Sequence, residues 1–281
     1  MIWLLPAALC SISIALILRH GETRGCDRLL LVGANYITAS VLAFLFILPR
    51  LAAPNTTTIA LGAVTGIDYV LGFLVLAAGI ARGPLAVPVT VMRLSVAVPI
   101  VVSIAVWAER PAGLQWAGLA LGAVAILLFG YSLSGGRGRK GDGGGYWMLI
   151  VALFLVMGAG DVLLKAFREL SPDSDRMTFT WILFTTAGLF TWLLVGLRRT
   201  PFDRRTFLLG LLLGVPNLFS TVFTLLALRR VPASIAFPFI NLTVIAGSAL
   251  LAFFIWRERL GRLSFAGLLL AAIALMLLPL V

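Results

Sequence analysis

Long apolar runs alternate with short polar breaks along nearly the whole chain. The hydrocarbon core of a bilayer takes roughly 20 apolar residues in an α-helix, and runs of that length recur. We predict helices over residues 3–19, 29–49, 59–81, 84–107, 113–132, 146–167, 178–197, 206–228, 233–256 and 263–280. The first run has no basic residue before it and no small-residue cleavage site after it, so we interpret it as a helix and not as a signal peptide. Because lipid offers unpaired peptide groups no partner, the pattern predicts an all-α integral membrane protein with ten transmembrane helices.

A polar, glycine-rich segment over residues 133–145 interrupts this pattern near the middle of the chain. Its composition is typical of a flexible linker. The pattern Gly136-x-Gly138-x-x-Gly141 within it resembles a dinucleotide fingerprint, but it follows a membrane helix instead of a strand, so we assign no nucleotide site. The segment divides the chain into residues 1–132 and residues 146–281, with five predicted helices each.

The two halves resemble each other at an offset of about 148 residues. The aligned motifs are Gly62-x-x-x-Gly66 with Gly210-x-x-x-Gly214 and, with one residue inserted, Trp107-Ala-Glu109-Arg110 with Trp256-Arg-Glu258-Arg259. Because five is an odd number of helices, the second copy enters the membrane from the opposite side. We therefore predict two inverted five-helix repeats related by a pseudo-two-fold axis in the membrane plane, an arrangement that recurs in secondary transporters.

The composition supports the membrane assignment, since 61% hydrophobic and 12% charged residues do not suit a water-soluble domain. The chain has 22 Lys and Arg against 11 Asp and Glu, which in a soluble protein would suggest nucleic acid. Here the charges lie between the apolar runs and indicate anchors at lipid headgroups, so we expect the bilayer and no nucleic acid as a partner. The two cysteines have no metal-binding spacing, and we expect neither metal nor cofactor.

Two charged residues lie near the middle of predicted helices. An ionised side chain at the bilayer centre costs about 2.5–3.5 kcal/mol on insertion scales, so Asp68 and Arg93 should face protein or water. Their depths differ by roughly 6 Å, a gap that a long arginine can span. One interpretation is therefore a structural ion pair between neighbouring helices, and the other is a solute site.

The repeat offset favours the solute site. Arg93 aligns with Asn241, and Asp68-Tyr69 aligns with Pro216-Asn217, so polar groups recur at equivalent depths in four helices. The predicted residues of a polar central cavity are Asp68, Tyr69, Arg93, Asn217 and Asn241. In this hypothesis Arg93 receives an anionic group of the solute and Asp68 an amine, since a guanidinium fork suits carboxylate or phosphate.

Several other residues have mainly structural interpretations. We expect Asp161 and Lys165, spaced i,i+4, to pair on one face of their helix near the membrane edge. Glu109 and Glu258 stand at helix ends, where a capping role or a salt bridge between loops is expected. The prolines within the fourth, eighth and ninth predicted helices should bend them around a cavity, and exposed carbonyls that coordinate solute are the alternative.

Taken together, the sequence resembles the drug/metabolite transporter superfamily, in particular its ten-helix branch with two EamA-type repeats. The resemblance rests on the repeat layout, on the Glu-Arg pairs that end the fourth and ninth helices, and on the glycines of the helices that follow, Gly118, Gly122 and Gly267. It implies transport of a small molecule and leaves the solute open. We expect an integral protein of a bacterial cell (inner) membrane.

The leading function is therefore a secondary transporter of small polar metabolites, amino-acid-like or otherwise anionic or zwitterionic, that works by alternating access. We expect no enzyme, because one histidine and two cysteines supply no catalytic constellation. A lipid flippase or a membrane-embedded lipid-modifying protein is the alternative. The paired glycines allow close helix contact, and one glycine face would also suit a homodimer.

The distribution of basic residues predicts the orientation of the chain. The loops between predicted helices one and two, three and four, five and six, seven and eight, and nine and ten carry about twice as many Lys and Arg as the other loops. Basic loops stay on the cytoplasmic side, which puts both termini outside. A cysteine introduced into the 198–205 loop should be protected from impermeant reagents in intact cells, and labelling from outside would contradict this orientation.

Overall fold

The computed structural model describes residues 2–50, 54–82, 86–134, 143–256 and 262–280. Over these ranges the chain is helical, without a strand. Eight helices are long and apolar enough to cross a membrane, and two shorter apolar helices, Gly113–Leu128 and Phe265–Leu277, add to them. For the described part of the chain, the predicted all-α membrane protein is confirmed, with eight helices of spanning length and two shorter apolar helices.

The helices follow the predicted ranges to within a few residues. Their bounds are α1 (Leu4–Thr23), α2 (Arg28–Ile47), α3 (Thr56–Arg82), α4 (Ala86–Leu94), α5 (Ala97–Trp107), α6 (Gly113–Ser134), α7 (Gly143–Leu170), α8 (Arg176–Leu197), α9 (Arg204–Ala227), α10 (Ala233–Trp256) and α11 (Arg262–Leu277). Two short 3-10 helices, Leu48–Arg50 and Asp173–Asp175, lie between them. The difference from the prediction is that the span expected over residues 84–107 consists of two helices, α4 and α5.

Pro99 explains the break between α4 and α5. Proline has no N–H, and its ring clashes with the carbonyl four residues earlier, which here belongs to Ser95. The Val98 N–H donates to the Ser95 carbonyl at 2.9 Å instead, and the Ser95 hydroxyl donates to the Met92 carbonyl at 2.7 Å. Gly158 of α7 lies against the break, where a Cβ would stand 2.9 Å from the Ser95 carbonyl oxygen. A glycine distant in sequence thus makes room for the interrupted backbone.

The other prolines leave their helices continuous. Pro88 lies in the first turn of α4, where a missing N–H is tolerated. The helices α9 and α10 run on through Pro216 and Pro238. Pro99 thus differs from Pro216 and Pro238 in lying at a break, and Gly158 packs against that break.

The described chain forms two compact units, and each combines helices from both halves of the sequence. One unit contains Leu71–Val162 and Arg230–Val281, and the other contains Ile2–Val70 and Leu163–Arg229. The division passes through α3 and α7, so each of these helices contributes to both units. The predicted repeats, 1–132 and 146–281, concern likeness of sequence and stay a prediction, and most of the predicted linker lies outside the described residues.

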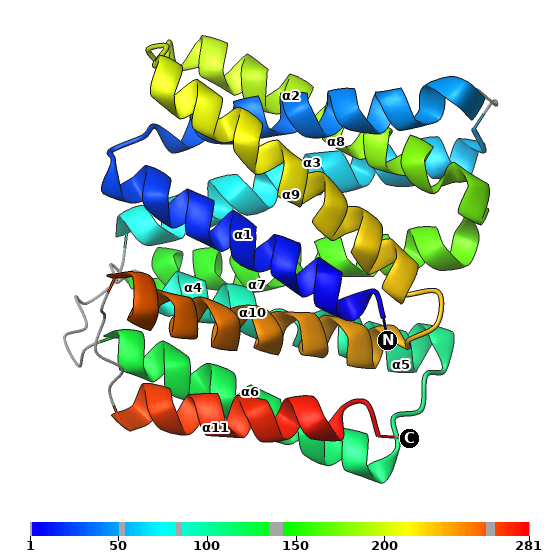
Figure 1. The fold of residues 1–281 in the computed structure, drawn as a ribbon, viewed down its shortest axis with the longest axis vertical. Helices are drawn as coiled ribbons and strands as arrows, with labels where there is room; N and C mark the ends of the chain where they lie inside the picture. Colours follow the sequence, from blue (N-terminus) through cyan, green and yellow to red (C-terminus); the bar gives the residue numbers. More distant parts are fainter. Residues whose placement is uncertain (1, 51–53, 83–85, 135–142, 257–261, 281) are drawn as a thin grey trace. The chain divides into compact units, whose positions relative to one another are not determined.

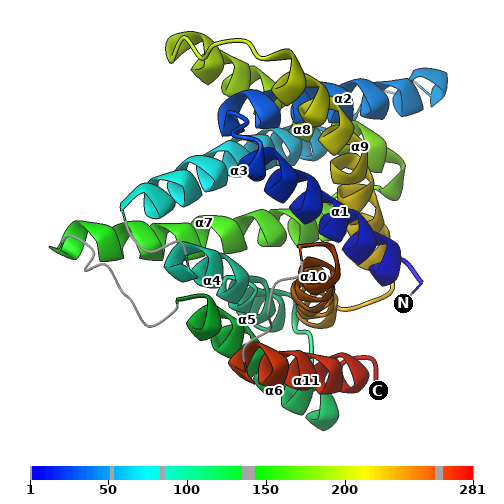
Figure 2. The same ribbon diagram turned by 60° about the vertical axis from the view of Figure 1, so that its left-hand side comes forward.

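In the unit that contains the N-terminal helices, α2 packs against α8 and α9, and α1 packs along α9 (Figures 1 and 2). Glycines bring the backbones into contact. A Cβ on Gly214 would lie 2.5 Å from the Asn35 carbonyl oxygen, and a Cβ on Gly66 would lie 2.5 Å from the Leu183 carbonyl oxygen. Small residues allow such close approach between membrane helices, so the glycine pairs seen in the sequence are packing positions.

Aspartate side chains cap the N-termini of two helices of this unit. Asp203 accepts hydrogen bonds from the Thr206 N–H at 2.9 Å and from the Thr206 hydroxyl at 2.6 Å at the start of α9. Asp27 accepts from the Leu30 N–H at 2.8 Å at the start of α2. The hydroxyl and the N–H of Thr206 favour the ionised form and hold the pKa of Asp203 below its usual range. Both residues satisfy N–H groups that have no partner within the helix.

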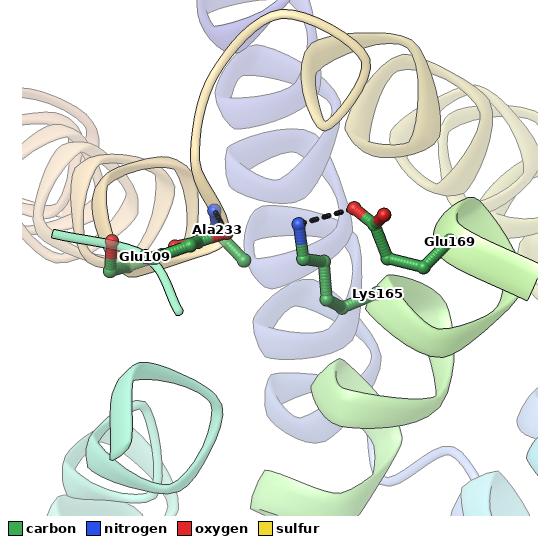
Figure 3. A network of polar contacts seen from close by, with 5 residues as sticks. Glu109, Lys165, Glu169 and Ala233 are labelled. Atoms are coloured by element: carbon green, nitrogen blue, oxygen red, sulfur yellow. Dashed lines mark hydrogen bonds and ion pairs between the residues drawn. The ribbon is translucent and has the colours of Figure 1, made fainter. Parts of the chain in front are cut away.

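In the other unit α6 packs along α11, as both ribbon views show, and α10 contacts α5, α6 and α11 (Figures 1 and 2). Glu109, just after α5, caps the start of α10 from a distant part of the chain. Its Oε1 accepts from the Ala233 N–H and its Oε2 from the Ser234 N–H, each at 2.9 Å (Figure 3). The capping role expected for Glu109 is confirmed, whereas Glu258 lies outside the described residues.

Lys165 of α7 is 5% exposed and donates to Glu169 Oε1 at 2.7 Å (Figure 3). The sequence predicts a pair with Asp161, four residues earlier, which stays a prediction, and the structure shows an ion pair with Glu169, four residues later. Both spacings place the two side chains on one helix face. The carboxylate of Glu169, in the last turn of α7, therefore compensates the charge of Lys165.

Replacing Gly214 by valine should destabilise the protein by about 1–3 kcal/mol, because the new side chain would meet the backbone of α2, which cannot move aside without unpacking the helix. Thermal unfolding in detergent micelles would measure the loss. Gly196→Val is the matched control, since a Cβ there meets nothing within 4 Å. Equal unfolding temperatures for the two variants would contradict the role assigned to Gly214.

Glu109→Gln should cost about 1 kcal/mol of unfolding free energy, because an amide offers one acceptor oxygen where the carboxylate offers two to the start of α10. Glu22→Gln, at an exposed ion pair with Arg28, is the control and should change stability far less. A Glu109→Gln protein as stable as the control would show that the cap contributes nothing.

Candidate functional site

Arg93 stands on the last turn of α4, immediately before the break in that span. Its Nη1 donates to Asn241 Oδ1 of α10 at 3.3 Å. The Asn241 Nδ2 donates to the Phe237 carbonyl of its own helix at 3.2 Å, which turns the amide oxygen toward Arg93. The structure thus brings together two of the five predicted site residues, Arg93 and Asn241, from the two halves of the chain.

The guanidinium of Arg93 keeps donors that a solute can use. It is a planar group with five N–H donors, and in the described part of the chain its hydrogen bond is the one to Asn241. That partner is neutral, so the hydrogen bond leaves the positive charge in place. The arrangement suits a carboxylate or a phosphate, which would accept two parallel N–H bonds.

Asp161 of α7 belongs to the same unit and acts electrostatically on Arg93. Its charge opposes that of the guanidinium, so the neighbourhood of Arg93 contains one charge of each sign and one amide. The sequence assigns Asp161 to a pair with Lys165 near the membrane edge and so misses it as a site residue. The feature of the sequence that could have marked Asp161 as a candidate is its position as an acidic residue inside an apolar run.

A second polar pair lies in the other unit, at the contact between α2 and α9. Asn217 Nδ2 donates to Asn35 Oδ1 at 3.1 Å, and Asn35 is 4% exposed. Asn217 is a predicted site residue, while Asn35 is not among the predictions. Asn35 is a polar residue inside the second apolar run, and this position could have marked it as a candidate. The hydrogen bond gives the buried amide of Asn35 a partner.

Asp68 and Tyr69 of α3 belong to the same unit as Asn217. The ring of Tyr69 packs edge-on against Phe184, with centroids 6.4 Å apart. Asp68 is half-buried, and among the described residues its carboxylate has neither a hydrogen bond nor an ion pair. The single central cavity lined by all five residues remains a prediction, as does the alternative ion pair between Asp68 and Arg93.

A groove of about 330 Å³ lies between α2 and α8. Ser40 and Thr185 share a hydrogen bond of 2.6 Å there, and Trp192 Nε1 donates to the Gly33 carbonyl at 3.1 Å beside it. None of the predicted site residues lines this groove. In the described ranges no group of three or more His, Cys, Asp or Glu side chains could hold a metal ion.

The chain was compared with known proteins. Residues 144–279 match the EamA-like transporter family. A solved structure titled "Crystal structure of protein" is similar in fold, with a TM-score of 0.76 and 15% identity over 98% of this chain and 94% of that one. No curated protein sequence matches. The match to the EamA-like transporter family covers nearly half of the chain and agrees with the resemblance to the drug/metabolite transporter superfamily seen in the sequence.

Proposed function

We propose that the protein is a secondary transporter of small anionic or zwitterionic metabolites, that it works by alternating access, and that Arg93 binds the anionic group. The family supports transport of a small molecule across the membrane. The observation that carries the solute class is the position of Arg93 in an apolar span, bonded to a neutral amide and with donors to spare. A charge is retained within a membrane span at a cost, and function is the usual reason. The expected location is a bacterial cell (inner) membrane.

The charge balance around Arg93 favours a zwitterion within this class. Asp161 and Arg93 carry opposite charges in one unit, so a solute with one anionic and one cationic group would add no net charge to a region of low polarity. Burying unbalanced charge is expensive. Arg93 would take the carboxylate, and Asp161, in addition to the predicted Asp68, is a candidate for the amine.

Contacts between α3 and α8 and between α9 and α2 support the proposed inverted repeats. Gly66 lies on the Leu183 carbonyl, and Gly214 lies on the Asn35 carbonyl. Gly66 and Gly214 are separated by about 148 residues, and so are Asn35 and Leu183. A two-fold rotation that exchanges the halves would therefore carry one contact onto the other. Gly66 lies in α3, the third predicted span, and Gly214 lies in α9, the eighth predicted span. The proposed repeat pairs these two spans.

Contacts between α2 and α8 follow the same relation. The rings of Phe44 and Trp181 pack with centroids 5.5 Å apart, and Trp192 donates to the Gly33 carbonyl. Phe44 corresponds to Trp192 at the offset, and Gly33 corresponds to Trp181. This exchange again fits a pseudo-two-fold axis, here between the second helix of each half. Inverted repeats of this kind suit alternating access, because each half can adopt the conformation of the other.

The match with a transporter family lends no support to a lipid flippase or a membrane-embedded lipid-modifying protein. The site around Arg93 points the same way, since its side chains recognise charge and hydrogen-bonding groups and supply no nucleophile or metal ligand set in the described residues. A transporter of small polar solutes is the function that these side chains fit best.

Arg93→Gln should leave a folded protein that no longer transports anionic or zwitterionic solutes efficiently. Loss of a charge-assisted hydrogen bond costs about 1.5–3 kcal/mol, which corresponds to about a tenfold to hundredfold fall in transport efficiency. Counterflow in proteoliposomes, with a panel of anionic, zwitterionic and cationic metabolites, would measure it. Arg93→Lys keeps the charge without the fork and should retain part of the activity. A folded Arg93→Gln protein with unchanged transport would defeat the proposal.

The ion-pair alternative makes a different prediction for stability. If Asp68 and Arg93 only neutralise each other, removing either should destabilise the protein, and replacing both by matched neutral residues should restore folding and transport together. If Arg93 binds solute, the double variant should fold and still fail to transport. The double variant therefore separates the two interpretations in one assay.

Asp161→Asn should reduce transport of zwitterionic amines more than transport of simple anions, because it removes the negative charge near Arg93 and leaves the guanidinium in place. The ratio of the two transport efficiencies in the same proteoliposomes gives the result. A fall that is equal for both solute classes would show that Asp161 only positions Arg93.

A further inference from the structure

The turn between α7 and α8 gathers more positive than negative charge. Arg229, just after α9, pairs with Asp173 through its Nη2. Arg176, the first residue of α8, is in electrostatic range of both Arg229 and Asp173. Asp173 thus pairs with Arg229 and acts electrostatically on Arg176, and these three side chains carry one positive charge in excess.

The neighbouring carboxylate is already engaged elsewhere. Asp175 Oδ2 accepts from the Asn55 N–H at 3.1 Å and from the Thr58 hydroxyl at 3.0 Å, at the start of α3. Ser174 donates to its other oxygen, Oδ1. Asp175 thus holds the beginning of α3 in place.

Polar atoms at this turn are buried without a hydrogen-bond partner. Within the described residues, these atoms are Arg168 Nε, Ser171 Oγ and Arg176 Nε. All three can donate, and two belong to guanidinium groups. Buried donors are usually satisfied in native proteins, so these atoms leave the turn with hydrogen-bonding capacity that an acceptor from outside the chain can meet.

The turn is held in shape by an aromatic stack. Phe167 of α7 and Phe179 of α8 pack face to face, with centroids 4.0 Å apart and planes 20° from parallel. Phe167 precedes Arg168, and Phe179 lies one turn after Arg176, so the stack fixes the helix ends that carry both arginines. Donors fixed in advance bind a ligand at lower entropic cost.

The position of the turn indicates what the acceptor is. Because α7 and α8 are both apolar enough to cross a membrane, the turn between them lies where the bilayer meets water, at the level of lipid phosphates. Leu170, in the last turn of α7, is 60% exposed and suits the boundary of the hydrocarbon region. We propose that Arg176 and Arg229 bind the phosphate group of an acidic phospholipid headgroup, with Arg168 in the last turn of α7 as a further donor. One phosphodiester supplies one negative charge, which matches the excess positive charge of Arg176, Arg229 and Asp173.

The lipid dependence of stability tests this site. Thermal unfolding would be compared in nanodiscs of phosphatidylcholine alone and in nanodiscs that also contain phosphatidylglycerol. The wild-type protein should unfold at a higher temperature with phosphatidylglycerol, and the double variant Arg176→Gln/Arg229→Gln should lose this increase. An equal increase in the wild-type protein and the double variant would overturn the proposal.

Arg28→Gln is the matched control. Arg28 begins α2 as Arg176 begins α8, and it corresponds to Arg176 at the repeat offset of about 148 residues. It has its own carboxylate, Glu22 Oε1, at 2.6 Å, and its side chain is 43% exposed, as is that of Arg229. Arg28→Gln should keep the full response to phosphatidylglycerol. Loss of the response in this control would mean that total positive charge matters and not the turn, which would also overturn the proposal.

Asp173→Asn should strengthen lipid binding at this site, where the double variant should weaken it. This test does not require the double variant to fold. It releases Arg229 from its ion pair, so the response to phosphatidylglycerol should grow. Glu22→Gln makes the same change of charge at the Arg28 pair and should leave the response unaltered. A response to Asp173→Asn no larger than that to Glu22→Gln would contradict the site.

Inorganic phosphate distinguishes a lipid from a soluble ligand. Added to protein in phosphatidylcholine nanodiscs, it should stabilise the wild-type protein little, since free phosphate lacks the acyl chains that hold a headgroup at the surface. A phosphate-dependent increase that is absent in the double variant would support the anion site and assign it to a soluble phosphate compound. The increase with phosphatidylglycerol should also shrink as salt is added, because the interaction is electrostatic.

Discussion

Every peptide group inside a bilayer must find its hydrogen-bond partner within the protein, because hydrocarbon offers none. This constraint makes each span a helix, and it also limits where a helix can stop. Hydroxyl side chains within the spans turn back to carbonyls of their own helix, as Thr65 does to Leu61 and Thr243 to Phe239. At the end of α4 the ladder is interrupted by Pro99, and the Ser95 hydroxyl and the Val98 N–H compensate locally. The interruption falls directly after Arg93, so the irregular backbone and the embedded charge occupy the same part of the fold.

The sequence predicts the spans well and their interruption poorly, for a physical reason. Apolar length is a strong signal because the thickness of the bilayer sets it. Pro99 signals a disturbed helix, but whether the helix bends or ends depends on what packs there, and Gly158 lies far away along the chain. Spacing within one helix is similarly ambiguous, since Lys165 has acidic residues four positions before and four positions after it, and the ion pair that the structure shows with Glu169 was not predicted.

Some residues of the candidate site can be predicted from the repeat in the sequence, and others are found only from the packing of the helices. The offset between the halves predicts that Arg93 and Asn241 are equivalent positions, and the structure places them in hydrogen-bond contact. Asn35 could not be found in this way, because it aligns with Leu183 and nothing in the first half marks it as a partner of Asn217. What the halves share is the close approach of a glycine to a carbonyl. Tyr36 and Phe184, equivalent at the offset, pack on each other with centroids 6.0 Å apart, as residues beside a pseudo-two-fold axis would.

The cap that Glu109 places on α10 ties two lengths of chain that lie far apart in sequence. It joins the end of α5 to the first residues of α10, while Arg93, in the other piece of the α4–α5 span, bonds to Asn241 farther along α10. Hydrogen bonds thus join the α4–α5 span to α10 at two places along its length, which opposes sliding of one against the other. A solute gripped by Arg93 and Asn241 would keep both ligands throughout a transport cycle. In the proposed transport cycle, the gate that admits and releases the solute would then be formed by other helices, and binding at Arg93 and Asn241 would be the same whichever side of the membrane the gate opens to.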